Sequence, residues 1–167
     1  NSRDAMKGQA MFKRLLNILM NLIILAAVIM LILLGIVGVR GFMLYKTQTD
    51  YKSLSAVAGE IRSEPLFTPT EELPEFYLKA VVAIEDRDFY KHNGIKVTSM
   101  LRAFIADVKA GAPVQGGSTI TQQLAKNELF TQEKTVDRKA AEIFAAFALE
   151  REFSKSEILE LYVNSIY

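Results

Sequence analysis

The first long feature of the chain is an apolar run, Leu15–Val39, in which none of the 25 side chains is charged. As a helix, this run would be roughly 38 Å long, which is enough to cross a hydrocarbon layer of about 30 Å. A secretory signal peptide would instead have an apolar segment of about 7–15 residues before a small-residue cleavage site, and here Arg40 and Phe42 surround Gly41. The pattern therefore predicts an uncleaved transmembrane anchor over residues 15–45, after a basic cytoplasmic tail, residues 1–14.

Beyond the anchor, polar and apolar positions recur with the period of helices, and no segment shows the period of two that is typical of a strand. Residues 46–69 are polar and end with two prolines, which predicts a stalk or linker. The spacing then predicts helices over residues 74–85, 98–110, 119–127, 136–152 and 154–167. Residues 70–167 are therefore expected to form a single, mainly α domain.

Caps and core stripes refine these helices. Thr98 is expected to cap the second and Gly111 to end it, Ser118 or Thr119 to cap the third, and Ser154 with Glu157 has the pattern of a capping box. The expected core stripes are Leu101, Phe104, Ile105 and Val108 on the second helix, Ala140, Ile143, Phe144 and Phe147 on the fourth, and Ile158, Leu159, Leu161 and Tyr162 on the last.

Charge is distributed unevenly along the chain. Residues 1–46 carry six Lys or Arg and one acid, whereas residues 47–167 carry 14 Lys or Arg and 18 acids. The basic flank of the apolar run favours a cytoplasmic N-terminus, and the acidic remainder argues against a nucleic-acid partner. The chain has no cysteine and one histidine, which excludes thiolate catalysis and zinc–thiolate sites.

The segment EDRDFYKHNG, residues 85–94, concentrates candidate chemistry. Glu85 ends a helix with an apolar face, where burial and the negative end of the helix dipole would suit a general base or acid. The alternative is a solvated glutamate paired with Arg87 or Lys91. Asp86 is expected to cap a turn or bind a cation, and Phe89 to lie in the core. His92 is expected to hydrogen-bond backbone in a turn.

The segment GGSTITQQLAKN, residues 116–127, places two glycines before a helix. Exposed amides at a helix N-terminus form a ready anion site, although the pattern is not that of a nucleotide P-loop. Gln122 and Gln123 could donate to sugar hydroxyls or face water. Downstream lies a basic set, Lys126, Lys134, Arg138 and Lys139, which could grip a diphosphate or form a solvated face, and Arg138 is spaced to pair with Glu142.

Together these segments resemble the family 51 glycosyltransferases, the peptidoglycan glycosyltransferases that polymerise lipid II. Four motifs occur in the family's order: EDRDFYKHNG at 85–94, GGSTITQQLAKN at 116–127, RKAAE at 138–142 and KSEILELYVN at 155–164. The resemblance covers residues 74–167 and implies a lysozyme-like helical domain near the membrane surface. It also implies an inverting transfer to a β-1,4 glycan with release of a polyprenyl diphosphate.

The resemblance assigns roles to individual residues. Glu85 would be the general base, and Glu142 a second catalytic glutamate that supports the diphosphate or a divalent cation. The substrate and diphosphate site would comprise Gly116, Gly117, Ser118, Thr119, Gln122, Gln123, Lys126, Asn127, Lys134, Arg138 and Lys139. Residues of the motifs with a mainly structural part would be Asp86, Phe89, His92, Gly94, Tyr162 and Asn164. The resemblance leaves open whether a Mg²⁺ or Mn²⁺ ion binds to Glu142 or Asp86 as a cofactor. It implies no organic cofactor.

The expected partners are lipid II, the growing glycan chain, membrane lipid and other wall-synthesis proteins, at a bacterial plasma membrane with the catalytic domain outside the cytoplasm. The family continues past the fourth motif, so the chain is expected to be a fragment. The lack of an upstream Asp-x-x-Gly hairpin favours a monofunctional enzyme over a class A penicillin-binding protein. Two other functions stay open: a membrane-anchored muramidase or lytic enzyme with Glu85 as general acid, and a non-catalytic scaffold for wall synthesis.

Overall fold

The computed structural model describes the backbone of residues 2–112 and 116–166, and the side chains of these residues except 2–7 and 10. The middle of the expected loop 111–117 and the side chains of Arg3 and Lys7 therefore lie outside the described residues. Within the described part every regular element is helical, which confirms the prediction of a mainly α chain. The chain divides into two units, residues 1–39 and 40–167.

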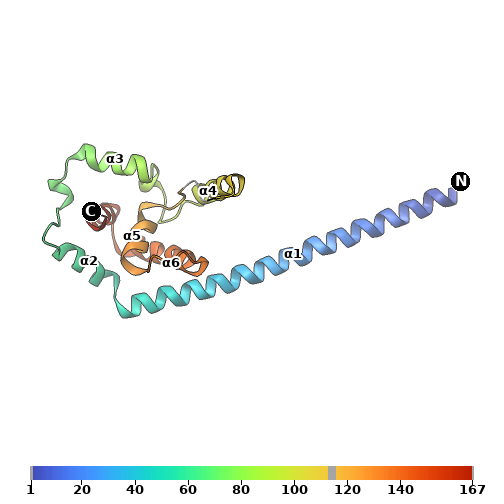
Figure 1. The fold of residues 1–167 in the computed structure, drawn as a ribbon, viewed down its shortest axis with the longest axis horizontal. Helices are drawn as coiled ribbons and strands as arrows, with labels where there is room; N and C mark the ends of the chain where they lie inside the picture. Colours follow the sequence, from blue (N-terminus) through green and yellow to red (C-terminus); the bar gives the residue numbers. More distant parts are fainter. Residues whose placement is uncertain (1, 113–115, 167) are drawn as a thin grey trace. The chain divides into compact units, whose positions relative to one another are not determined.

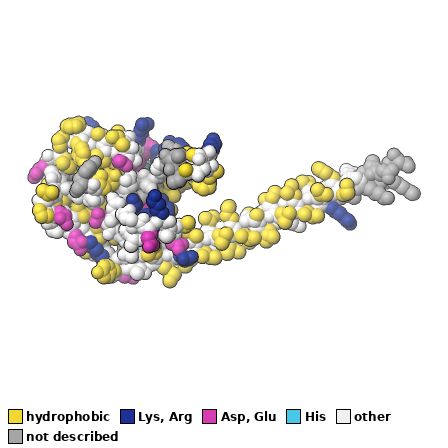
Figure 2. Space-filling view, viewed as in Figure 1, with side chains coloured by type: hydrophobic (Ala, Val, Ile, Leu, Met, Phe, Trp, Pro, Cys, Tyr) yellow, Lys and Arg dark blue, Asp and Glu magenta, His cyan; other side chains and the backbone are white. Residues whose placement is uncertain are grey.

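The first unit is part of helix α1, Ser2–Tyr51. Hydrophobic side chains cover its surface (Figure 2), and side chains such as Leu22 and Leu31 are more than half exposed. Within the part of the chain that the structure describes, Met11–Tyr51 is the one segment long and apolar enough to cross a membrane. Such a surface is typical of a helix that crosses a membrane.

The second unit contains the last turns of α1 and the remaining helices (Figure 1). These helices are α2 (Leu54–Ser63), α3 (Glu75–Glu85), α4 (Val97–Ala110), α5 (Ile120–Leu129), α6 (Val136–Glu152) and α7 (Lys155–Ser165), with 3₁₀ turns at Thr70–Glu72 and Phe89–Lys91. Helix α5 packs against both α6 and α7, and α2 packs against α7. The core therefore surrounds α5, the helix that carries the second motif.

The prediction of a stalk over residues 46–69 is wrong. Helix α1 continues to Tyr51, and α2 buries Leu54, Val57, Ala58 and Ile61 in the core. These four positions follow the spacing of an amphipathic helix, and the hydroxyl of Ser53 caps its first turn. The polar composition of the segment concealed this short helix.

Helix α6 has the predicted bounds, but its predicted core stripe is wrong. Its buried apolar side chains are Ala141, Ala145, Ala146 and Leu149, whereas Phe147 is 40% exposed. Small side chains allow the backbones of α5 and α6 to approach closely, so the buried face is marked by alanine and not by phenylalanine. The stripe predicted on α7 is confirmed, because Ile158, Leu159, Leu161 and Tyr162 are all buried.

Helix α4 also differs from its prediction. It begins at Val97, so Thr98 is not its cap, although Gly111 ends it in the left-handed conformation, φ +66°. The four residues of its expected core stripe, Leu101, Phe104, Ile105 and Val108, are exposed. The buried contact of α4 is instead Ala103, against which Gly117 lies so closely that a Cβ on Gly117 would stand 2.8 Å from the Ala103 Cβ.

Candidate active site

A polar groove of about 490 Å³ brings the first two motifs together. Glu85 lies on one side at the C-terminal end of α3, and residues 116–119 lie on the other, ahead of α5. Residues 85–88 and the start of α4 complete the lining. Segments 30 residues apart in sequence thus face one cavity, as the resemblance requires of a catalytic site.

Glu85 is exposed, so the expectation that it is buried is wrong. It pairs with neither Arg87 nor Lys91, the partners of the alternative interpretation. Its Oε2 accepts a hydrogen bond of 2.9 Å from Nε2 of Gln123, whose Oε1 accepts a bond of 3.2 Å from the hydroxyl of Tyr162. Side chains from α5 and α7 therefore orient a carboxylate that remains open to the groove.

Asp86, the next residue, turns away into the protein and is 7% exposed. Its Oδ2 lies 2.8 Å from Nε2 of His92 and accepts a bond of 3.3 Å from the backbone N–H of Ile120, the first residue of α5. His92 therefore contacts a carboxylate, and the prediction that it bonds backbone is wrong. The buried Nδ1 of His92 has no partner among the described atoms, so Nε2 makes the polar contact of this ring.

Three backbone amides at the N-terminus of α5, where the sequence predicts an anion site, already have partners inside the protein. Asp86 occupies the N–H of Ile120. Thr119 and Gln122 form a capping box in which each side chain accepts from the other's backbone N–H at 3.1 Å. The side chain of Gln122 is therefore buried and does not line the groove.

The third motif forms a cluster of charges on α6 around the buried Glu142. Glu142 is 1% exposed and accepts hydrogen bonds from Arg138 and from Nζ of Lys139, the latter at 2.6 Å. Lys139 also donates to Oγ of Ser118 at 2.7 Å. Because two cations pair with one carboxylate, the cluster has a net positive charge. Lys139 places part of that charge at the edge of the groove.

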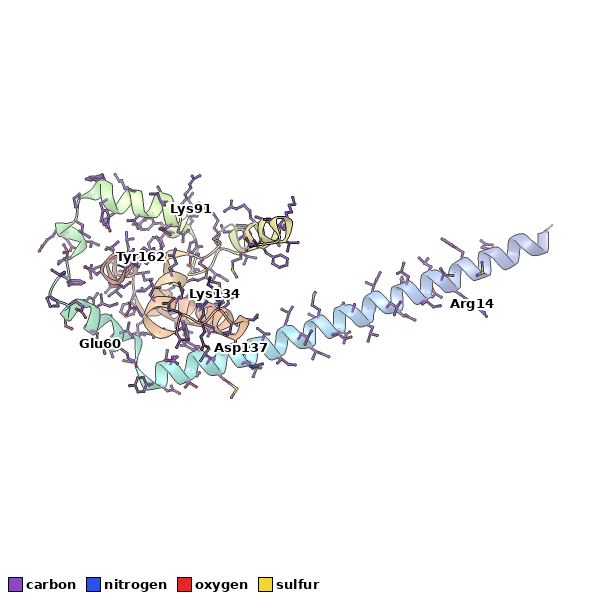
Figure 3. The ribbon with its side chains drawn as sticks, in the orientation of Figure 1. Arg14, Glu60, Lys91, Lys134, Asp137 and Tyr162 are labelled. Carbon is purple, nitrogen blue, oxygen red and sulfur yellow. The ribbon has the colours of Figure 1, made fainter. Side chains whose placement is uncertain are left out.

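The cations that line the groove are not the four expected from the sequence. Lys126 and Lys134 are absent from the lining, and Lys134 lies just before α6 (Figure 3). The groove is lined instead by three cations outside the predicted substrate and diphosphate site, Arg87, Lys96 and Arg102. Arg102 follows Ser99 by three residues on α4, and both side chains line the groove. This spacing, which places two polar side chains on one face of a helix, is the signal in the sequence that could have identified Arg102.

These three groove cations differ in their partners. Lys96 pairs with Asp88, and its hydrogen bond is the main reason that the pKa of Asp88 is lowered below its ordinary value of 3.8. Arg87 donates to the carbonyl of Ala83, and Arg102 donates to Oγ of Ser99. Neither arginine forms an ion pair within the described ranges, so both are available to an anionic ligand.

The residues proposed for a divalent cation do not fit one. Both oxygens of Glu142 are bound by cationic side chains, and Asp86 is engaged by His92 and by a backbone N–H. The described residues contain no group of three or more His, Asp or Glu side chains that could hold a metal.

The remaining motif residues lie in the framework around the groove. Phe89 is fully buried, and Gly94 has φ +85° with its backbone against Ala146. Asn164 binds both backbone groups of Thr68, at 2.8 and 2.9 Å, and so ties the segment before α3 to α7. Asn127 is partly exposed on α5 and is absent from the groove lining.

Comparison with known proteins finds similar sequences over most of the second unit. The family model described as Transglycosylase matches residues 52–167. Penicillin-binding protein 1F of Bacillus subtilis is 49% identical over 96 residues, which are 58% of this chain and 13% of that protein. Penicillin-binding protein 1B of Haemophilus influenzae is 40% identical over 125 residues, 73% of this chain and 16% of that protein. The chain thus spans about a seventh of the length of these curated relatives.

Proposed function

Because the chain belongs to the transglycosylase family, whose model matches it over residues 52–167, we propose that it takes part in peptidoglycan glycosyl transfer. In this proposal the substrate is a disaccharide linked through a diphosphate to a polyprenyl lipid. The chain would add such units to a β-1,4 glycan and release the polyprenyl diphosphate. The observation that carries the proposal is the groove in which Glu85 faces residues 116–119.

Glu85 would act as the general base. Its carboxylate is open to the groove and held by Gln123 at 2.9 Å, so it can accept a hydrogen bond from an acceptor sugar. As the 4-hydroxyl oxygen of that sugar attacks the anomeric carbon, Glu85 takes its proton and the bond to the diphosphate breaks. Attack opposite the leaving group inverts an α-linked donor to a β-linked product.

The departing diphosphate would be stabilised by groove cations. Arg87 and Arg102 line the groove without an ion pair in the described part of the chain, and Lys139 reaches its edge at Ser118. Fixed cations stabilise negative charge that develops in a transition state more strongly than water does. An enzyme that hydrolyses finished glycan would not need such a set, which favours transfer over the lytic alternative.

A lipid-linked substrate also requires an enzyme at a bilayer. The chain carries a helix long and apolar enough to span one, and the exposed apolar side chains of α4 lie on the same helix as Ser99 and Arg102 of the groove. We propose that the catalytic unit lies outside the cytoplasm, with the N-terminus in the cytoplasm. We also propose that other wall-synthesis proteins are partners of this chain.

The test is to incubate the detergent-solubilised chain with labelled lipid-linked disaccharide and separately with finished glycan. Polymer from the first substrate supports glycosyl transfer, and cleavage of the second would support a lytic enzyme instead. Glu85→Gln should lower polymerisation by about 10²- to 10⁴-fold, the usual contribution of a general base, while the substrate still binds. Glu75→Gln, at an exposed site on the same helix, is the matched control, and full turnover by Glu85→Gln would refute the assignment.

A further inference from the structure

A close contact joins the last turns of α1 to α6 within the second unit. Gly41 of α1 is buried, and a Cβ added to it would lie 2.4 Å from the Cβ of Ala140 and 3.0 Å from the backbone C of Ala140 and N of Ala141. Two of these three atoms belong to the backbone of α6, so a change of rotamer cannot relieve the overlap. Any larger residue at position 41 must move one helix against the other.

Contacts on both sides of Gly41 hold the two helices in this register. Arg40 forms an ion pair of 2.7 Å with Asp137, one turn of α6 before Ala140. Phe42 packs edge-on against Phe144 with ring centroids 5.4 Å apart, and Tyr45 stacks on the same ring at 6.4 Å. Arg40 is largely exposed, so its ion pair contributes little and the close approach with the aromatic packing carries the contact.

The same turns of α6 carry the charge cluster. Lys139 precedes Ala140 and donates to Ser118 at 2.7 Å, and Glu142, which follows Ala141, binds both Lys139 and Arg138. Helix α6 therefore contacts both α1 and the groove loop through neighbouring residues. Because Lys139 and Glu142 lie within one turn of Ala140 on the same helix, a displacement of the backbone at Ala140 also moves them.

The glycine itself is unfavourable for a helix. Glycine in a helix interior is about 1 kcal/mol less favourable than alanine, and Gly41 lies ten residues before the end of α1. The close contact with Ala140 explains why position 41 is a glycine. At Gly38 of the same helix, by contrast, a Cβ would meet nothing within 4 Å.

We infer that Gly41 is a positioning residue: its contact with Ala140 sets where α6 holds Lys139 against Ser118 and hence the cationic edge of the groove. The expected effect of Gly41 on activity rests on the proposed function. It follows from the general observation that displacing a catalytic group by about 1 Å can lower the rate by about a hundredfold. Its geometric part, the position of α6, is independent of any activity.

The experiment compares Gly41→Ala, Ala140→Gly, the double variant and Gly38→Ala in the full chain in detergent. Amide hydrogen exchange is followed over residues 137–142 and over α7, with kcat and KM for lipid-linked disaccharide measured in parallel. Gly41→Ala should speed exchange at 137–142 by about tenfold or more and lower kcat more than it raises KM. Ala140→Gly removes the nearest atom but leaves the two backbone atoms at 3.0 Å, so the double variant should recover only part of both losses. Gly38→Ala should change neither.

Val57→Ala, a core substitution on α2, supplies a chain with lowered stability and an intact α1–α6 contact. If Gly41→Ala speeds exchange uniformly over α6 and α7 as Val57→Ala does, or changes nothing, the positioning role is overturned. If the wild-type chain polymerises nothing, the proposed function fails, and the exchange comparison still decides the role of Gly41.

Discussion

The ammonium group of Lys139 donates a hydrogen bond of 2.7 Å to the hydroxyl of Ser118. This bond joins α6 to the loop that lines the groove opposite Glu85. Lys139 is itself held by Glu142, which also binds Arg138. The third motif therefore acts on the groove through one lysine, whose position depends on a carboxylate buried behind it.

Glu142→Gln should destabilise the protein. The substitution leaves the largely buried guanidinium of Arg138 without its counter-charge, and loss of one partner from a buried ion pair costs about 3–5 kcal/mol. We expect the free energy of unfolding in urea to fall by about 3 kcal/mol. Glu152→Gln, at an exposed position on the same helix, should have little effect. Equal stability of the two variants would contradict the inferred role of Glu142.

Asp86→Ala should loosen the joint between the first and second motifs. The carboxylate accepts hydrogen bonds from His92 and from the N–H of Ile120, and both donors would be left unsatisfied. A buried polar group without a partner costs about 1–3 kcal/mol, and urea unfolding should show a loss of this size. Tyr90→Phe, at an exposed site in the same segment, is the control, and a loss no larger than that of the control would count against the joint.

Arg102→Gln should weaken the binding of a diphosphate-bearing lipid, measured by titration. Arg102 lines the groove and forms no ion pair in the described residues, and a hydrogen bond to a charged group contributes about 1.5–3 kcal/mol. The affinity should therefore fall by about tenfold or more. Lys79→Gln, at an exposed position on α3 outside this groove, should bind as the wild type does. An unchanged affinity for Arg102→Gln would remove Arg102 from the site.

The resemblance makes the same prediction for Lys126→Ala, although Lys126 does not line the groove. Titration of both variants against the same lipid decides between the two cations. If only Lys126→Ala loses affinity, the diphosphate binds beyond this groove.

Glu128→Gln should stabilise the protein at neutral pH. Partial burial is the main cause that raises the pKa of Glu128 above its ordinary value of 4.5, and Glu60 adds to it. A raised pKa means that the ionised form is less favourable in the folded than in the unfolded chain. The wild type should therefore lose stability relative to Glu128→Gln as the pH rises above about 4.5. Thermal unfolding between pH 4 and pH 8 measures this, and a constant difference in Tm would contradict it.

Local patterns in the sequence predicted much of the framework correctly. The capping box at Ser154, the left-handed Gly111, the core face of α7 and the bounds of α6 are all set by residues within a few positions of one another. Such features depend on backbone conformation and on side-chain spacing along a helix, so a single segment contains the information for them.

The burial of particular faces depended on the tertiary structure. The sequence could not show that α6 presents its alanines to α5, or that the apolar face of α4 is left exposed, because a periodic stripe does not say which helix will cover it. It could not show that Asp86 would occupy the N-terminus of α5, because that contact joins residues 34 positions apart.

For this protein the sequence alone determined the helical class, the apolar segment and the identity of the four motifs. The tertiary structure decided which charged side chains face the groove and which are neutralised behind it, so that Arg87 and Arg102 line it while Glu142 and Arg138 pair in the interior. The physical reason is that a side chain's charge is a property of its residue, whereas its exposure and its partners depend on segments far along the chain.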